Sequence, residues 1–165
     1  MKTVVLKFGG TSVGTIDRIK KVCKIIAFYK KKNNSVVVVS SAMAGVTNEL
    51  VNKSKLISKN FDRAEYDALV STGEQVSCAL IAGRLKHNGF KSRSWTSWQL
   101  PILTDGPHSS ARITSVKIKE INLYIKSGGI PIITGFQGVS KDLRTTTIGR
   151  SGSDATAIMI AKFIK

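Results

Sequence analysis

Apolar residues along the chain follow two alternating patterns. The segments "TVVLKFGG", "SVVVVSSA" and "IPIITGFQG" are continuous apolar runs that end in small residues, which is typical of strands buried on both faces of a parallel sheet. Between them, apolar residues recur at helical spacing with lysines at the intervening positions, as in residues 16–31. These patterns predict strands at 3–10, 35–42, 90–95 and 130–138, and helices at 16–31, 46–59, 64–87, 116–127 and 154–165.

The remaining segments carry turn signals. Residues 102–113, "ILTDGPHSSARI", are predicted to form a loop, and residues 139–150, "VSKDLRTTTIGR", a hairpin that leads into the last helix. Strands that alternate with helices favour a layered α/β fold with a mostly parallel sheet. Ligands of such folds bind beyond the carboxyl ends of the strands. We therefore look for chemistry in the segments that follow the predicted strands.

Length and composition indicate one globular domain over residues 1–165, with 42% hydrophobic residues. No apolar run approaches the roughly 20 residues that cross a bilayer, so we expect no membrane partner. The amino-terminal "MKTVVLKFGG" enters a strand directly and has no secretory signal. Cys23 and Cys78 lack metal-ligand or CxxC spacing and are expected to be reduced, buried thiols. A cytoplasmic location is the simplest expectation.

The formal net charge of +16 comes from 26 Lys and Arg against 10 Asp and Glu. Such a charge points to nucleic acid or another anionic partner. Many of the lysines, however, fall on outer helix faces or at helix carboxyl ends, as in "YKKKNN", where they complement the helix dipole. We favour a solvated lysine-rich surface without a nucleic-acid partner. A basic nucleic-acid-binding module is kept as an alternative.

The segment "KFGGTSVG" follows the first predicted strand. Glycine amides beside a helix start can cradle an anion, and the Lys7 ammonium would complete a phosphate site. The spacing is not that of a Walker loop, because Thr15 stands where the lysine of that motif belongs. A tight strand–helix turn with an outward-reaching lysine explains the same residues equally well.

Glu74 in "STGEQVS" lies on an apolar stripe of its predicted helix. Val70, Cys78 and Ile81 share that stripe at helical spacing. A carboxylate among apolar side chains costs several kcal/mol unless it is paired. Glu74 therefore has either a structural ion-pair partner or a cationic group of a ligand.

The segment "GRSGSD" precedes the last predicted helix. Ser153 or Asp154 is the expected N-cap of that helix. The Arg150 guanidinium in addition offers a planar fork for a carboxylate or phosphate. His87 and His108 have no metal-ligand spacing with the cysteines, so no protein metal site is predicted.

Five segments together resemble the amino acid kinase family and, within it, the aspartokinase branch. They are, in chain order, "KFGGTSVG", "SSAMAGVTN", "STGEQVS", "GFQG" and "TTTIGRSGSDATA". The resemblance implies a three-layer α/β/α sandwich with a mostly parallel sheet. It also implies transfer of the ATP γ-phosphoryl group, with Mg²⁺, to the β-carboxylate of L-aspartate, the first step toward lysine, threonine and methionine.

The resemblance also assigns roles to individual residues. ATP contacts fall to Lys7, Phe8, Gly9, Gly10 and Ser41. Aspartate contacts fall to Thr47, Glu74, Arg150, Ser151, Gly152 and Ser153. Lys7 and Asp154 are the implied catalytic residues, and Glu74 would receive the substrate ammonium while Arg150 binds a carboxylate.

Two positions and the end of the sequence depart from the family pattern. Ala44 replaces a frequent serine and Ser151 a frequent glycine, and both changes exchange small side chains. Aspartokinases continue with a nucleotide-binding half and regulatory ACT domains, so we expect residues 1–165 to be a partial kinase domain with impaired activity. The expected protein partner is a homo-oligomer or a separate C-terminal half, and a non-catalytic docking fragment remains the alternative.

Overall fold

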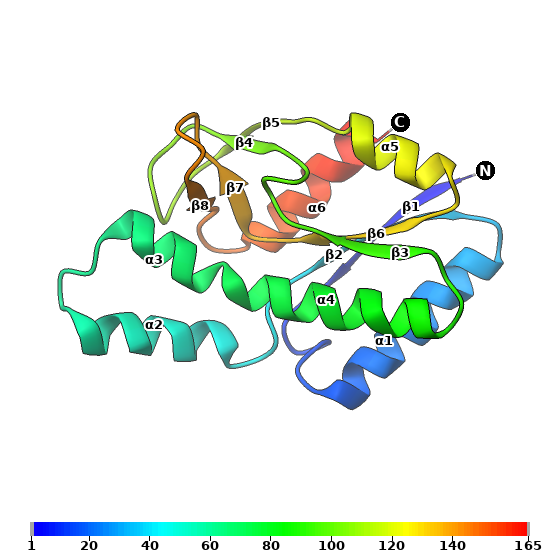
Figure 1. Cartoon of the computed structure of the whole chain (residues 1–165), viewed down its shortest axis with the longest axis horizontal. Coiled ribbons are helices and arrows are strands. Elements are labelled where there is room, and N and C mark those ends of the chain that lie inside the picture. Colours follow the sequence, from blue (N-terminus) through cyan, green and yellow to red (C-terminus); the bar gives the residue numbers. More distant parts are fainter. Residues whose placement is uncertain (1, 165) are drawn as a thin grey trace.

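The structure, a computed structural model, describes residues 2–164 and centres on a parallel four-stranded sheet (Figure 1). Its strands, in spatial order, are β1 (Thr3–Phe8), β2 (Ser35–Ser40), β6 (Ile130–Thr134) and β3 (Ser92–Trp95). The β2 segment "SVVVVS" is buried at every position, as its continuous apolar run predicts. The register aligns Phe8 with Ser40 and Ser40 with Thr134, so three strands end side by side.

Helices cover both faces of this sheet. On one face lie α1 (Ile16–Lys31) and α4 (Thr72–His87), and on the other lie α5 (Lys119–Lys126) and α6 (Gly152–Phe163). Successive β2 side chains alternate between the two cores: Val36 and Val38 pack toward α1 and α4, while Val37 and Val39 pack toward α5 and α6. The predicted three-layer α/β/α sandwich with a parallel sheet is confirmed.

A second, smaller sheet lies beside the first at one end of the molecule (Figure 1). Its strands are β5 (Ile113–Val116), β4 (Ile102–Thr104), β7 (Gln137–Val139) and β8 (Thr145–Thr147), in that spatial order. The antiparallel β7–β8 pair confirms the predicted hairpin. The predicted loop at 102–113 is wrong in part, because it contains β4 and the start of β5. These strands are too short to show a period in the sequence.

Two helix predictions need correction. The predicted helix over 64–87 is divided into α3 (Arg63–Val70) and α4, which meet at Ser71. The predicted helix over 116–127 is shortened to α5, because Val116 belongs to β5. The remaining helix, α2 (Val46–Ile57), pairs with α3 at the side of the sandwich (Figure 1).

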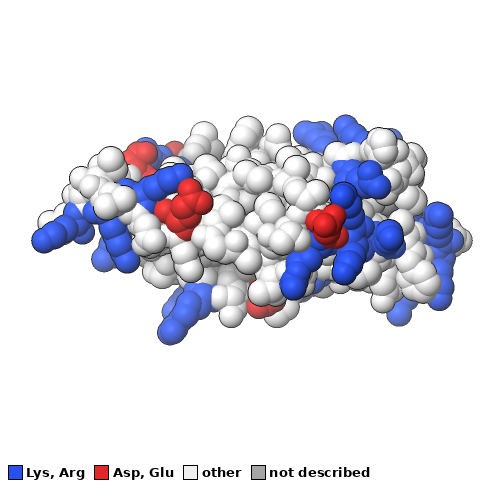
Figure 2. Space-filling model, turned by 90° about the horizontal axis from the view of Figure 1, so that it is seen from below, with Lys and Arg blue, Asp and Glu red and all other residues white. Residues whose placement is uncertain are grey.

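The basic residues are spread over the surface. Lys20, Lys21 and Lys24 are exposed on α1, opposite its buried apolar stripe. On the face shown in Figure 2, Lys and Arg gather in separate groups toward the two ends, with a broad uncharged region between them. This distribution is the one that solvated helix faces produce, and it forms no continuous basic groove on that face.

Two further sequence features have a place in the fold. Cys23 and Cys78 are free thiols, and both are buried. Burial raises the pKa of the Cys23 thiol to about 11. Among residues 2–164, no helix combines the length and the apolar character needed to cross a membrane.

Candidate functional site

A cavity of about 360 Å³ opens where β1, β2 and β6 end. Its walls come from five segments: the β1 exit, the β2 exit with the start of α2, the first turn of α4, Phe136, and residues 149–154. Ten of the predicted site residues line it: Lys7, Gly10, Ser41, Thr47, Glu74, Arg150, Ser151, Gly152, Ser153 and Asp154. Phe8 and Gly9 adjoin it through the same β1 exit without lining it. This is the sheet edge that the fold class predicts.

Glu74 is the unusual side chain of this cavity. It is only 3% exposed, and one carboxylate oxygen, Oε1, accepts a hydrogen bond from the Ala42 amide at 3.1 Å. The other oxygen, Oε2, is buried and has no hydrogen-bond partner among residues 2–164. Burial raises the pKa of Glu74 to about 7, and the Ala42 hydrogen bond offsets part of that rise. Because Glu74 lines the cavity, a ligand bound there is the candidate partner for this oxygen.

The loop after β2 is fastened to α4 next to Glu74. The Ser77 hydroxyl donates to the Ser41 carbonyl at 2.7 Å, one helical turn beyond Glu74. Gly73 allows the close approach, because a Cβ there would lie 2.8 Å from the Ala42 side chain. Small residues in "SSAMAG" and "STGEQ" therefore bring the loop amide within reach of the Glu74 carboxylate.

Lys7 and Asp154 form an ion pair across the cavity. The Lys7 Nζ lies 2.8 Å from Asp154 Oδ1, and both side chains remain partly exposed. The expected anion cradle of free amides is only partly present, because the amides of Ser12, Val13 and Gly14 donate to carbonyls of the same turn. α1 itself begins only at Ile16, after the N-cap Thr15. Lys7, paired with Asp154, is the cationic side chain that the end of β1 contributes to the cavity.

The 149–154 segment lies close to the residues that follow β6, and glycines on both sides make this approach possible. A Cβ on Gly135 would lie 2.5 Å from Ser153 Oγ, and one on Gly152 would lie 2.9 Å from the Phe136 ring. The predicted N-cap is wrong: Ser151, with φ of 59°, occupies that position without a side-chain cap, and the helix begins at Gly152. Ser153 and Asp154 therefore do not cap the helix, and both line the cavity.

Arg150 is an exposed residue in the lining of the cavity, and within residues 2–164 it has no acidic partner. An unpaired guanidinium facing a cavity is suited to a ligand carboxylate or phosphate. Glu74 and Arg150 thus offer opposite charges from separate walls.

Some lining residues were not predicted as site residues from the sequence. They are Ala42, Met43, Ala44, Gly45, Asn48, Phe136 and Gly149, and all belong to the segments that carried the family resemblance. Phe136 has a left-handed backbone with φ of 67°, which the sequence "GFQG" does not reveal. No three His, Cys, Asp or Glu side chains gather as a metal site anywhere in residues 2–164.

Known proteins resemble this chain in sequence and in fold. The sequence model described as the amino acid kinase family matches residues 2–165. The aspartokinase of Rickettsia bellii (strain RML369-C) is 49% identical over 100% of this chain and 41% of that protein. The aspartokinase of Geobacillus stearothermophilus is 47% identical over 100% of this chain and 40% of that protein. The chain therefore spans about two fifths of the length of these relatives.

Solved structures have the same fold. The aspartate kinase from Synechocystis superposes with a TM-score of 0.82 at 40% identity, over 98% of this chain and 26% of that chain. E. coli aspartokinase III, in complex with lysine and aspartate, superposes with a TM-score of 0.81 at 25% identity, over 98% of this chain and 46% of that chain. Since the family match extends over nearly the whole sequence, the chain belongs to the amino acid kinase family.

Proposed function

We propose that the cavity binds L-aspartate and serves phosphoryl transfer from ATP to its β-carboxylate. The carrying observation is Glu74, a lining residue of the same cavity as Arg150, whose buried Oε2 has no hydrogen-bond partner among residues 2–164. A ligand with an ammonium and a carboxylate would satisfy both groups. The relatives named aspartokinase support this choice of amino acid.

In the proposed complex, Glu74 receives the aspartate ammonium and Arg150 a carboxylate. Thr47, Ser151, Gly152 and Ser153 line the space between these charges and are proposed to contact the same ligand. The cation beside Glu74 would lower the pKa of its carboxyl from about 7, so binding should be accompanied by proton release near neutral pH. Proton release on binding is therefore a signature of the proposed pose.

The proposed chemistry needs no general base. The β-carboxylate of aspartate, with an ordinary pKa of about 3.9, is ionised at neutral pH and is already a nucleophile. Its oxygen attacks the γ-phosphorus, the bond from that phosphorus to the bridging oxygen breaks, and ADP leaves. Such transfers depend on positioning and charge neutralisation. Lys7 is proposed to neutralise charge on the transferred group, and Asp154 to position Lys7 through their ion pair.

The nucleotide part of the proposal rests on fewer residues. Phe8, Gly9, Gly10 and Ser41 lie at the ends of β1 and β2 and are proposed to adjoin the ATP phosphates. Magnesium typically binds through one or two carboxylates plus substrate phosphates, which suits a site where Asp154 is the exposed carboxylate. We include in the proposal that the adenine and ribose pocket comes from a C-terminal half, in this or a separate polypeptide. The proposal also includes a cytoplasmic location for the protein.

Isothermal titration calorimetry with L-aspartate tests the amino acid site. The chain should bind aspartate, and Glu74→Gln should weaken binding at least a hundredfold, because a neutral amide cannot form an ion pair with the ammonium. Glu49→Gln is the matched control, since Glu49 is an exposed helix carboxylate that pairs with Lys53 on the same helix. Equal affinities of wild type and Glu74→Gln would refute the proposed pose.

Formation of aspartyl hydroxamate from aspartate, hydroxylamine and Mg-ATP tests the reaction. Any activity should be lost in Lys7→Ala. A chain that binds aspartate but forms no hydroxamate would support an amino acid half-site that needs further sequence for nucleotide. A chain that binds no aspartate would refute the proposed function.

A further inference from the structure

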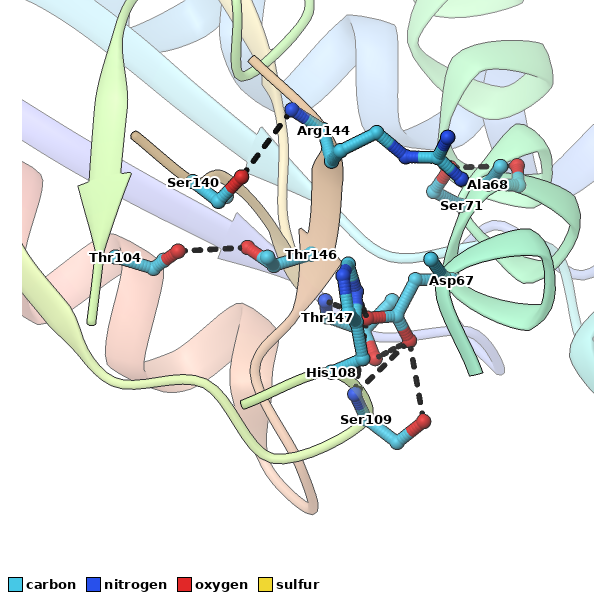
Figure 3. Close-up of polar contacts among 12 residues, drawn as sticks. Asp67, Ala68, Ser71, Thr104, His108, Ser109, Ser140, Arg144, Thr146 and Thr147 are labelled. Atoms are coloured by element: carbon cyan, nitrogen blue, oxygen red, sulfur yellow. Dashed lines mark hydrogen bonds and ion pairs between the residues drawn. The ribbon is translucent and has the colours of Figure 1, made fainter. Parts of the chain in front are cut away.

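Asp67 is a fully buried carboxylate outside the cavity. It lies on α3 with 0% of its surface exposed. Its oxygens accept hydrogen bonds from His108 Nδ1 at 2.9 Å, from the Ser109 amide at 2.9 Å and from the Ser109 hydroxyl at 3.3 Å. They also accept from the Thr147 amide at 3.1 Å and the Thr147 hydroxyl at 2.6 Å. Figure 3 shows these donors converging on Asp67 from two other segments.

The carboxylate is therefore saturated by donors of the protein itself. Burying a charge is costly, and replacing a buried polar cluster with apolar residues is often neutral or stabilising. Stability alone is thus a weak explanation for a charge at this place. What the cluster does supply is directional bonding, which sets the relative position of α3, the 108–109 turn and the end of β8.

Two of the segments that meet at Asp67 continue along the chain to residues that line the cavity. Thr147 ends β8, and Arg150 follows three residues later. On the other side, α3 passes through Ser71 into α4, so that Glu74 lies seven residues beyond Asp67. Asp67 therefore links the segment that leads to Arg150 with α3, and α3 continues into α4, which carries Glu74.

A second buried contact fastens the same junction. The Gln137 side-chain amide donates to the Ser71 carbonyl, between Asp67 and Glu74, and Gln137 Oε1 accepts from the Thr134 hydroxyl at 3.0 Å. Gln137 begins β7, the hairpin partner of β8. The helix junction is thus held to the β7–β8 hairpin at two points.

We propose that Asp67 is a positioning residue that fixes the separation between Glu74 and Arg150. The inference rests on the proposed function, because it makes these two charges the ends of one ligand site. A ligand that bridges both charges is sensitive to their separation, and a misplacement of about 1 Å can cost a hundredfold in rate. A ligand that contacts only one of the two charges is not sensitive to their separation.

Thr147→Val tests the inference with little loss of shape. Valine keeps the β-branched side chain and the backbone amide but removes the hydroxyl that donates to Asp67. Thr147→Ser restores the hydroxyl and is the rescue variant. Glu65→Gln is the matched control, because the exposed Glu65–Arg144 ion pair also joins α3 to the hairpin but lies outside the buried cluster.

Calorimetry should separate bridging from non-bridging ligands. In Thr147→Val we expect affinity for L-aspartate to fall about tenfold, while affinity for succinate, which lacks the ammonium, changes less than twofold. Thr147→Ser and Glu65→Gln should both stay within twofold of wild type for both ligands. Unchanged aspartate affinity in a folded Thr147→Val protein, or an equal loss for both ligands, would overturn the inference.

Hydrogen exchange decides the inference without any ligand. In Thr147→Val the amides of Gly152, Asp154 and Ala155, which close the turn around Ser151, should exchange about tenfold faster. The amides of α1 and β2 should be unchanged. A uniform acceleration, or none, would overturn the positioning role. If wild type binds no aspartate, the proposed function fails, and this exchange pattern alone settles whether Asp67 holds the 149–154 segment.

Discussion

Two buried carboxylates, Asp67 and Glu74, lie seven residues apart on the α3–α4 pair and have opposite surroundings. Asp67 accepts hydrogen bonds from side chains or amides of His108, Ser109 and Thr147. Glu74 accepts one from the Ala42 amide, and its second oxygen is buried without a partner among residues 2–164. Neither carboxylate is more than 3% exposed.

The difference separates a structural carboxylate from a ligand-binding one. A buried polar group that the protein satisfies completely contributes directional bonding and leaves nothing for a ligand. One that is left half satisfied keeps a free-energy penalty that an incoming cation can remove. We therefore expect Asp67 to matter most for folding, and Glu74 to oppose folding in the absence of ligand.

The largest expected effect is that of Asp67→Ala. Removing the carboxylate leaves the part-buried donors of Ser109 and the buried donors of Thr147 without an acceptor, which should lower the free energy of unfolding by about 3–5 kcal/mol. Urea unfolding measures this change. Asp142→Ala, at an exposed position in the β7–β8 connection, is the control and should change stability by less than about 0.5 kcal/mol. Similar effects of Asp67→Ala and Asp142→Ala would show that Asp67 is not a structural carboxylate.

Glu74→Gln should stabilise the ligand-free protein at alkaline pH. Because burial raises the pKa of Glu74 from 4.5 to about 7, the folded state binds its proton more tightly than the unfolded state does. The associated stability is fully present below about pH 4.5 and is lost as the pH rises through about 7. At about 1.4 kcal/mol per pH unit, the ionised carboxylate costs up to about 3 kcal/mol at pH 8.

Urea unfolding of wild type and Glu74→Gln at pH 4.5 and pH 8 isolates this contribution. The variant should match wild type at pH 4.5 and exceed it at pH 8. Saturating L-aspartate should narrow the gap at pH 8, because it stabilises only the wild type. A gap that is the same at both pH values would show that Glu74 is not the group that titrates.

Two glycines of α4 should respond in opposite directions. Gly73→Ala places a methyl 2.8 Å from the Ala42 side chain and should destabilise the protein by about 1–3 kcal/mol. Gly83→Ala meets no atom within 4 Å and should stabilise it by about 0.5–1 kcal/mol through helix propensity. Thermal unfolding compares the two. Equal effects would mean that α4 does not need its close approach to the β2 loop.

The smallest expected effect on stability is that of Lys7→Met. The Lys7–Asp154 ion pair is partly exposed on both sides, so its loss should change the free energy of unfolding by less than about 1 kcal/mol. Its loss should nevertheless abolish any hydroxamate formation. A destabilisation above 2 kcal/mol in urea unfolding would place Lys7 with Asp67 among the structural groups.

Much of the fold followed from pattern alone. The continuous apolar run of β2 and the lysine-flanked stripe of α1 appear at the predicted positions, because β2 is buried at every position and α1 repeats its apolar stripe over several turns. The short strands β4 and β5 were missed, and so was the break at Ser71. Strands of three or four residues show no period, and their pairing depends on contacts distant in sequence.

For the candidate site, the sequence alone identified which residue types are present but not which hydrogen bonds they form. Glycines after strands, Lys7, a carboxylate on an apolar stripe and Arg150 could each be read from their neighbours. Tertiary structure alone decided that Glu74 keeps one oxygen without a partner in residues 2–164, and that Asp67, unremarkable in sequence, is saturated. The reason is physical: hydrogen-bond satisfaction depends on which distant segments meet, and no local pattern encodes that meeting.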